Sequence, residues 1–220
     1  MPIGLFKYSV FSVILFITAC PSQEVDILKA GSITADEDLV SETNYGEGIA
    51  HCKAVFDNML KTTGSASSTA DCLIGYQLPS FSANTIGGKK ITNESLKGKL
   101  TVINFWFTAC RPCVAEIPGF NDIVDKYGKD KINYISIGRD SKSEVEGFLR
   151  KQPWKFDHIV DAESLIKGEF MFMWGFPTTM LVDESGKIIH AINRGKSGPS
   201  APEHLKRRIV PHIDRALASK

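Results

Sequence analysis

Two cysteines separated by two residues follow a long apolar run, and this feature constrains the fold more than any other. The run "KLTVINFWF" (99–107) suits a central strand, because strands buried on both faces are nearly continuously apolar. A helix is predicted to follow from Arg111 to about Tyr127. Cys110 then stands at the N-terminus of this helix, and Cys113 lies one turn further along.

A helix N-terminus is a favourable place for a reactive cysteine. Its unpaired amides and the positive end of the helix dipole stabilise a thiolate, which is the nucleophilic form of cysteine. Lowering a thiol pKa from about 8.5 to about 7 raises the thiolate fraction at neutral pH from a few per cent to about half. Arg111 adds a positive charge, and Pro112 suits a first helical turn because it lacks a donor. The alternative for Arg111 is a solvent-facing side chain without influence on the sulfur.

A metal site and a structural staple are the other interpretations of this cysteine pair. A structural zinc site needs four ligands, and the sequence has no second C-x-x-C or matching histidine pair at a useful spacing. A disulfide across two residues closes a very short loop and stabilises little through chain entropy. Redox chemistry accounts better for the pair, and we predict neither a metal nor a cofactor.

The N-terminus predicts export and lipidation. Lys7, the apolar stretch 10–17 and the small residues before Cys20 form a secretory signal. The stretch is too short for a membrane-spanning helix, which takes roughly 20 apolar residues. The tetrapeptide "ITAC" resembles the lipobox of bacterial lipoproteins, whose cysteine carries the lipid. We therefore expect a signal peptide over 1–19 and a lipid anchor on Cys20 in the bacterial cell envelope, facing away from the cytoplasm. The alternative is a secreted protein with Cys20 as a free thiol.

Two further cysteines, Cys52 and Cys72, form a second candidate pair, because disulfides persist outside the cytosol. A bridge between them would close a loop of about 20 residues and contribute about 3 kcal/mol in the chain-entropy model. The alternatives are two unlinked thiols, or a zinc site that also uses His51. The segment 20–75 is otherwise polar, with one helical pattern that carries Cys52, and we assign it to an N-terminal extension and linker.

From residue 76 onward, strand and helix patterns alternate. Gly87 and Gly88 separate two short β-prone runs, which indicates a hairpin. We expect strands at "INYISI", "FDHIV", "TTMLVD" and "KIIHAIN", and helices at "SEVEGFLRK", "AESLIKGEFMF" and about Pro202 to Ala218. This alternation predicts an α/β sandwich with a central mixed sheet flanked by helices. The net charge of +1 gives no electrostatic footprint for nucleic acid.

The motifs "INFWFTACRPCVAEIP" and "GFPTTMLVDESGKI" resemble the TlpA/ResA branch of the thioredoxin superfamily, the membrane-tethered thiol-disulfide oxidoreductases outside the cytoplasm. The resemblance covers roughly 76 to 218. It implies a thioredoxin-like domain over 76–220 that begins with the hairpin.

The resemblance also implies roles for individual residues. Cys110 would be the exposed attacking sulfur and Cys113 the buried resolving one. Pro177 matches a cis-proline that positions an extended substrate segment, and Glu116 matches a glutamate that exchanges a proton with the second cysteine. Asn104 replaces the buried aspartate of cytosolic thioredoxins, which strengthens the assignment of Glu116.

A substrate groove is expected beside the cysteine pair. We assign to it Trp106, Ala109, Arg111, Pro112 and Phe176. Two of these depart from the family pattern: Ala109 stands where Trp is common, and Phe176 where Thr, Val or Ile is commoner. These departures leave the choice of partner open.

The leading prediction is an envelope oxidoreductase that exchanges a disulfide with protein partners through Cys110. The resemblance favours a reductant, which requires a membrane or envelope electron donor. A peroxiredoxin-like peroxidase is one alternative, but it needs a Pro and a Thr or Ser where Ile103 and Phe107 stand. The other alternative is a non-catalytic binding lipoprotein on the same fold.

Overall fold

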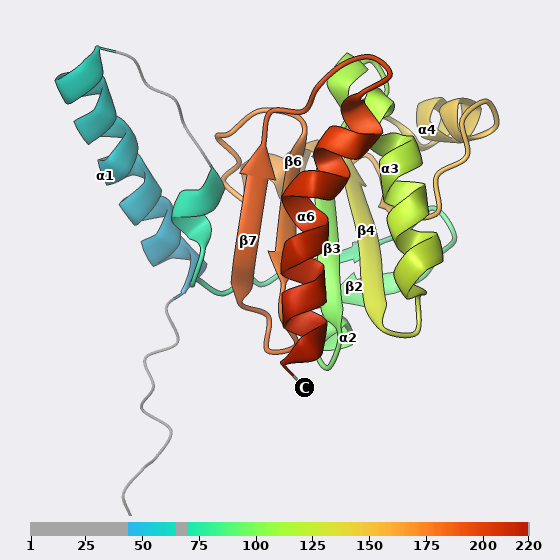
Figure 1. Ribbon diagram of the computed structural model, residues 1–220, viewed down its shortest axis with the longest axis horizontal. Helices are drawn as coiled ribbons and strands as arrows, with labels where there is room; N and C mark the ends of the chain where they lie inside the picture. Colours follow the sequence, from blue (N-terminus) through green and yellow to red (C-terminus); the bar gives the residue numbers. More distant parts are fainter. Residues whose placement is uncertain (1–43, 65–69, 220) are drawn as a thin grey trace, which may run out of the picture. The chain divides into compact units, whose positions relative to one another are not determined.

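A five-stranded mixed sheet forms the centre of the computed structural model, which describes residues 44–64 and 70–219 (Figure 1). Its strand order is β5-β4-β3-β6-β7, with β3, β4 and β5 parallel and β6 and β7 antiparallel to their neighbours. The strands are β3 (Leu100–Trp106), β4 (Ile132–Gly138), β5 (Asp157–Ile159), β6 (Thr178–Val182) and β7 (Ile188–Asn193). The predicted mixed sheet is confirmed. The predicted signal peptide and Cys20 lie outside the described residues.

Strand β3 explains why distant parts of the sequence meet. All seven of its residues are buried, as the apolar run predicts. It pairs in parallel with β4, where Trp106 lies opposite Gly138, and antiparallel with β6, where Phe105 lies opposite Thr178. The carboxyl end of β3, which leads to Cys110, therefore lies next to the start of β6, which follows Pro177.

Helices cover both faces of the sheet. They are α1 (Tyr45–Thr63), the short 3-10 helix η1 (Ala70–Leu73), α2 (Asn93–Leu96), α3 (Arg111–Tyr127), α4 (Lys142–Leu149), α5 (Glu163–Lys167) and α6 (Ala201–Ala218). In Figure 1, α3 and α6 lie side by side over one face. Alternate β3 residues divide the core: Val102 and Trp106 join the cluster under α3 and α6, whereas Ile103 and Phe105 join the cluster on the other face.

The predicted hairpin is present as β1 (Ser82–Asn84) and β2 (Lys90–Thr92), paired antiparallel. Its turn needs a glycine because Gly88 has a φ of 81°, a left-handed conformation that other residues rarely adopt. The predicted helices over 111–127 and about 202–218 are also present, as α3 and α6.

The helix predicted over "AESLIKGEFMF" is too long. Helix α5 ends at Lys167, and the chain then folds back, with Phe170 N–H donating to Leu165 O (3.1 Å) and Phe172 N–H donating to Ile166 O (3.0 Å). Met171 has a φ of 41°, which is incompatible with continuing the helix. Burial of the Phe170 ring, 0% exposed, outweighs the local helical pattern.

The N-terminal extension contributes to the domain core. Helix α1 begins at Asn44, whose side chain accepts a hydrogen bond from Glu47 N–H, and ends at Gly64. Tyr45, Ile49 and Cys52 are buried in the same cluster as Phe105. The core thus extends beyond the expected boundary at residue 76. In the described part of the chain, no helix combines the length and apolar character that crossing a membrane requires.

Candidate active site

Cys110 and Cys113 form a disulfide at the start of α3, with Cα atoms 5.3 Å apart. Cys110 is the N-cap residue of the helix, and its sulfur accepts a hydrogen bond from Cys113 N–H at 3.4 Å. This is the strand–cysteine–helix junction that the sequence predicted. An amide that already points at the Cys110 sulfur would stabilise negative charge there after reduction.

The expectation of an exposed Cys110 is wrong for this disulfide-bonded state. Cys110 is only 5% exposed and Cys113 only 2% exposed. Cys110 lies in the cluster under α3 and α6, against which Phe107 and Phe176 also pack. A partner must therefore approach a sulfur that is nearly covered in this state, and we call Phe107 and Phe176, which pack against its cluster, the rim of the approach.

The Phe176–Pro177 bond is cis, as the resemblance implies. The Pro177 carbonyl accepts a hydrogen bond from Arg194 N–H at 3.2 Å, which ties the proline to the end of β7. On the other side of the loop, the Thr178 hydroxyl donates to Gly175 O at 2.7 Å. These bonds fix the loop that leads into β6.

Glu116 is a buried carboxyl group one turn after Cys113, and it is 3% exposed. Burial raises its pKa to about 7, while the positive charge of Arg208 opposes that rise. Arg208 is itself held in place, because its Nη1 donates to Asn193 O (3.2 Å) and Arg194 O (3.1 Å). Glu116 can therefore gain or lose a proton near neutral pH.

Gly195 allows the backbone after β7 to pass close to both Glu116 and Pro177. A Cβ atom at residue 195 would lie 2.6 Å from Glu116 Oε1 and 2.8 Å from Pro177 Cγ. Both distances are shorter than packed atoms tolerate, so any side chain here would displace one of the two residues. Sequence reasoning missed this glycine because its importance depends on three distant segments.

An aromatic pair with a cation forms the rim of the approach. The rings of Phe107 and Phe176 meet edge to face at 5.3 Å, and the Arg139 guanidinium lies 4.0 Å from the Phe107 ring centre. Sequence reasoning also missed Arg139. The signal for it is the register of β3 and β4: Trp106 pairs with Gly138, which brings their next residues together.

Comparison with known proteins decides the family. Residues 74–191 match the AhpC/TSA family, which is more than half of the chain. The chain belongs to the AhpC/TSA family. A thiol-disulfide oxidoreductase ResA of Bacillus thuringiensis subsp. konkukian is 32% identical over 142 residues, covering 63% of this chain and 79% of the relative. A thiol:disulfide interchange protein DsbE homologue of Paracoccus denitrificans is 30% identical over 156 residues, covering 67% and 79%.

A solved structure supports a thioredoxin-like fold. A thiol:disulfide interchange protein of the thioredoxin family from Chlorobium tepidum superposes with a TM-score of 0.50 at 26% identity, covering 61% of this chain and 94% of that one. The predicted thioredoxin-like fold is confirmed. The predicted enzyme class, a thiol-disulfide oxidoreductase, is confirmed by the ResA and DsbE relatives.

The remaining groove residues of this AhpC/TSA family member divide into two groups. Ala109 and Arg111 are exposed, and Pro112 and Phe176 are half-buried. Arg111 thus faces solvent, as its alternative interpretation expected. The assignment of Trp106 to the groove is wrong: it is 0% exposed and packs edge to face on Trp154 at 4.9 Å. Its place inside β3 turns it towards the core under α3.

Asn104 stays buried beneath the site. It is 1% exposed, and its Nδ2 donates to the Thr179 hydroxyl at 2.9 Å. It contributes no carboxylate, and Glu116 is the one buried acidic residue among residues 44–64 and 70–219.

The second cysteine pair is also oxidised. Cys52 and Cys72 are joined by a disulfide with Cα atoms 5.3 Å apart, which fastens α1 to η1. Their sulfurs are bonded to each other and not to zinc with His51. Over residues 44–64 and 70–219, no three metal-ligating side chains cluster.

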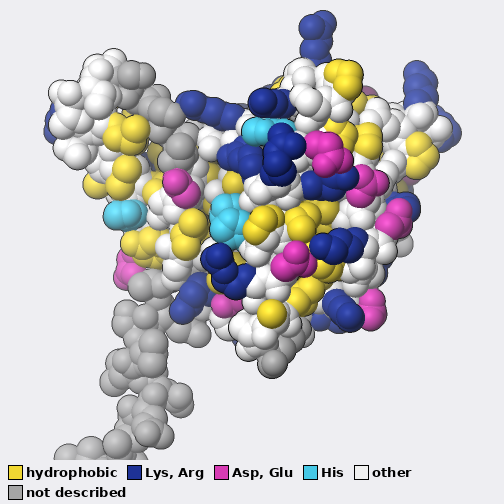
Figure 2. Space-filling view, viewed as in Figure 1, with side chains coloured by type: hydrophobic (Ala, Val, Ile, Leu, Met, Phe, Trp, Pro, Cys, Tyr) yellow, Lys and Arg dark blue, Asp and Glu magenta, His cyan; other side chains and the backbone are white. Residues whose placement is uncertain are grey.

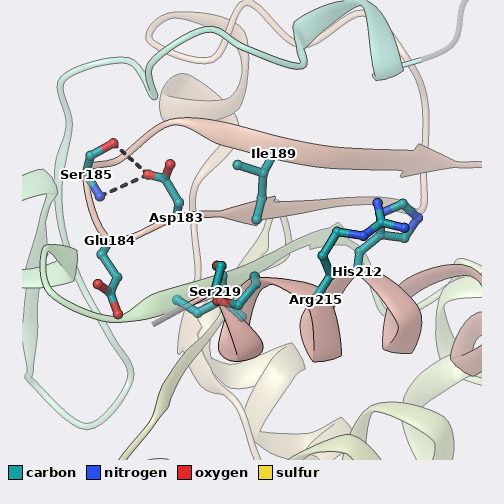
Figure 3. A pocket seen from close by; sticks show the side chains of 9 residues that line it. Asp183, Glu184, Ser185, Ile189, His212, Arg215 and Ser219 are labelled. Atoms are coloured by element: carbon teal, nitrogen blue, oxygen red, sulfur yellow. Dashed lines mark hydrogen bonds between the residues drawn. The ribbon is translucent and has the colours of Figure 1, made fainter.

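A pocket of about 610 Å³ lies away from the cysteines, between the β6–β7 turn and the last turns of α6 (Figure 3). Its lining includes Asp183, His212 and Arg215. The Asp183 carboxylate is committed to the turn, because it accepts hydrogen bonds from Ser185 N–H (2.9 Å) and Lys187 N–H (3.0 Å). The pocket contains neither of the two disulfides nor Pro177.

Proposed function

We propose that Cys110 and Cys113 are the working redox pair and that they exchange a disulfide with protein partners outside the cytoplasm. The observation that carries this proposal is the position of Cys110 as N-cap of α3, with the Cys113 amide directed at its sulfur. The cis Pro177 and the buried Glu116 support it, because they add a substrate-positioning loop and a proton acceptor. The names of the relatives supply the reaction class.

The reaction proceeds through a mixed disulfide. In the reduced protein, the Cys110 thiolate attacks one sulfur of a partner disulfide, and the other partner sulfur leaves as a thiolate. The Cys113 thiol gives its proton to Glu116 and attacks Cys110 Sγ. The disulfide seen here forms, the second partner thiolate leaves, and two electrons have passed to the partner. A dithiol donor in the membrane or envelope then restores the reduced pair.

The reduction potential of the Cys110/Cys113 pair tests this function. It is measured on a soluble protein that starts after Cys20, by equilibration with glutathione or dithiothreitol. The Cys52→Ser/Cys72→Ser variant is the control. We expect a reversible two-electron couple at about −270 mV or lower, typical of reductants; a value near about −120 mV would indicate an oxidant. If no reversible couple appears, the protein is a binding lipoprotein on this fold.

The peroxidase alternative is tested beside it. Ile103 is 0% exposed within β3, and Phe107 carries no hydroxyl, so neither can hydrogen bond a peroxide at Cys110. We expect no hydrogen peroxide consumption above that of the Cys110→Ser variant. Peroxide turnover that depends on Cys110 would replace disulfide exchange as the main activity.

We propose that Cys20 carries a lipid that anchors the protein to a membrane. The support is the lipobox-like "ITAC" segment. Metabolic labelling with a radioactive fatty acid is expected to label the full chain and not its Cys20→Ser variant. Equal labelling of both proteins contradicts the anchor.

A further inference from the structure

A cluster of cationic side chains lies beside the candidate active site, between the end of β7 and the first half of α6. We call it the basic patch; it consists of Arg194, Lys196, Arg207 and Arg208, which are grouped around His204. Figure 2 shows Lys and Arg side chains gathered around a histidine in the upper part of this face. Burial and the charges of Lys196, Arg208 and Arg207 lower the pKa of His204, which indicates that these charged groups lie near it.

Hydrogen bonds connect the basic patch to the redox loop. Arg194 N–H donates to Pro177 O at 3.2 Å, and Arg208 Nη1 donates to Arg194 O at 3.1 Å. Gly195, between Arg194 and Lys196, packs directly on Pro177 and Glu116. Arg194 and Lys196, which are exposed, therefore flank the glycine that packs on Pro177.

The charges of the patch are not neutralised within the described chain. No salt bridge among residues 44–64 and 70–219 includes a member of the patch. The nearby acid Glu203 pairs instead with Lys206 at 2.6 Å, and Lys206 also binds Asp122 at 2.8 Å. Arg208 also interacts with the buried carboxyl group of Glu116, but the raised pKa of that group, about 7, leaves it only partly ionised at neutral pH. Like charges held this closely repel each other and attract an external anion.

We propose that the basic patch binds a carboxylate-rich segment of the partner protein, next to the cysteine that reacts with Cys110. The proposal rests on the function proposed above and adds the chemistry of the partner. Charge complementarity beside a reactive site raises the encounter rate and disfavours basic partners. An anionic membrane surface is the competing ligand, but Arg194 is hydrogen-bonded to Pro177, the residue proposed to position a substrate segment. The position of the patch therefore favours a protein segment.

Peptide kinetics test the proposal. Three peptides each carry one cysteine in mixed disulfide with glutathione, flanked by Glu, Gln or Lys, and react with the reduced protein. The Lys196→Gln/Arg207→Gln variant removes two exposed patch charges that contact no reacting atom. The Lys53→Gln/Lys131→Gln variant is the control; it removes the same charge from α1 and from the residue before β4, at the opposite end of the sheet.

For the parent protein we expect the Glu peptide to react fastest, the Gln peptide more slowly and the Lys peptide most slowly. The patch variant should react about three- to tenfold more slowly with the Glu peptide only, and this difference should vanish at about 0.5 M salt. The control variant and the rate with dithiothreitol should stay unchanged. Equal losses for all peptides, or the same loss in the control variant, overturn the proposal.

A vesicle assay distinguishes an anionic membrane surface from a protein segment as the ligand of the patch. The patch would be assigned to a membrane if the parent binds vesicles of anionic phospholipid, the patch variant does not, and the peptides react at equal rates. That result overturns the proposal. Absence of exchange with all peptides and with dithiothreitol would instead contradict the proposed function.

Discussion

Glu116 combines a buried position, one turn from Cys113, with a pKa of about 7. Its ionised form can accept the proton of the Cys113 thiol, so exchange should accelerate as pH rises through about 7. Glu116→Gln should lose this rise, follow the ordinary thiol range near about 8.5, and react roughly tenfold more slowly at neutral pH. Stopped-flow measurement of the exchange rate of both proteins between pH 5 and 9 tests this prediction. The exposed Glu94→Gln is the control, and a parent-like profile in Glu116→Gln contradicts the role.

The same carboxyl group makes folding stability depend on pH. Its pKa is about 7 when folded and 4.5 in the unfolded reference, so its protonated form is favoured in the native state. The resulting stabilisation is present below pH 4.5 and lost as pH rises through about 7. Relative to Glu116→Gln, the parent should lose about 3 kcal/mol of its free energy of unfolding between pH 4 and 8. Urea unfolding at both pH values checks this; parallel pH dependences would disprove it.

Gly195 is the residue whose replacement should disturb the site without changing its chemistry. Gly195→Ala forces a methyl group against Glu116 and Pro177 and should destabilise the fold by about 1–3 kcal/mol, with slower exchange. Gly87→Ala is the matched control, because its Cβ would meet no atom closer than 3.9 Å. Thermal unfolding and exchange assays compare the two. Equal effects would show that Gly195 has no special packing role.

At the scale of elements, α1 supports the loop before Pro177. The Tyr45 hydroxyl donates to Phe170 O at 2.8 Å. The Phe170 ring packs on Phe105 (5.0 Å), Phe105 on Phe172 (4.8 Å) and Phe172 on Phe176 (4.9 Å). These contacts connect α1 to the rim of the approach and hold a loop whose Met171 has a strained positive φ of 41°.

Loosening α1 should therefore loosen this loop. Cys52→Ser/Cys72→Ser should lower the free energy of unfolding by about 3 kcal/mol, and Tyr45→Phe by about 1 kcal/mol. In both variants, hydrogen exchange should accelerate over 168–176 and stay unchanged in β4, whose pairing does not involve α1. Lys53→Ala, exposed on α1, is the control. Unaltered exchange over 168–176 would mean that α1 only caps the core.

Local patterns were sufficient for most elements. The apolar run of β3, the glycines of the hairpin and the start of α3 were predictable, because each depends on near neighbours. Where tertiary packing decides, the predictions failed: α5 stops at Lys167 because Phe170 turns into the core, and Trp106 faces away from the groove. The contacts of Gly195 and Arg139 depend on how the strands are paired, and a single sequence does not specify that register.

At the scale of the whole molecule, the domain includes more than the family match. The match starts at residue 74, yet Tyr45, Ile49 and Leu73 belong to the core. A fragment starting at residue 74 should expose that apolar surface and unfold at a lower temperature than one starting at residue 44. Differential scanning fluorimetry and gel filtration of both fragments measure the difference. Equal melting temperatures and monomeric behaviour would show that the extension is dispensable.

The spacing of the two disulfides also bears on how the chain acquires them. Apart from Cys20, the four cysteines allow three pairings, and an oxidising compartment can form any of them while the chain is still emerging. The native bridges join partners 20 and 3 residues apart, so each closes a shorter loop than any crossed pairing would. The four cysteines of these two bridges precede β6 in the chain. The native pairing of these cysteines can therefore form before β6 and β7 have been synthesised.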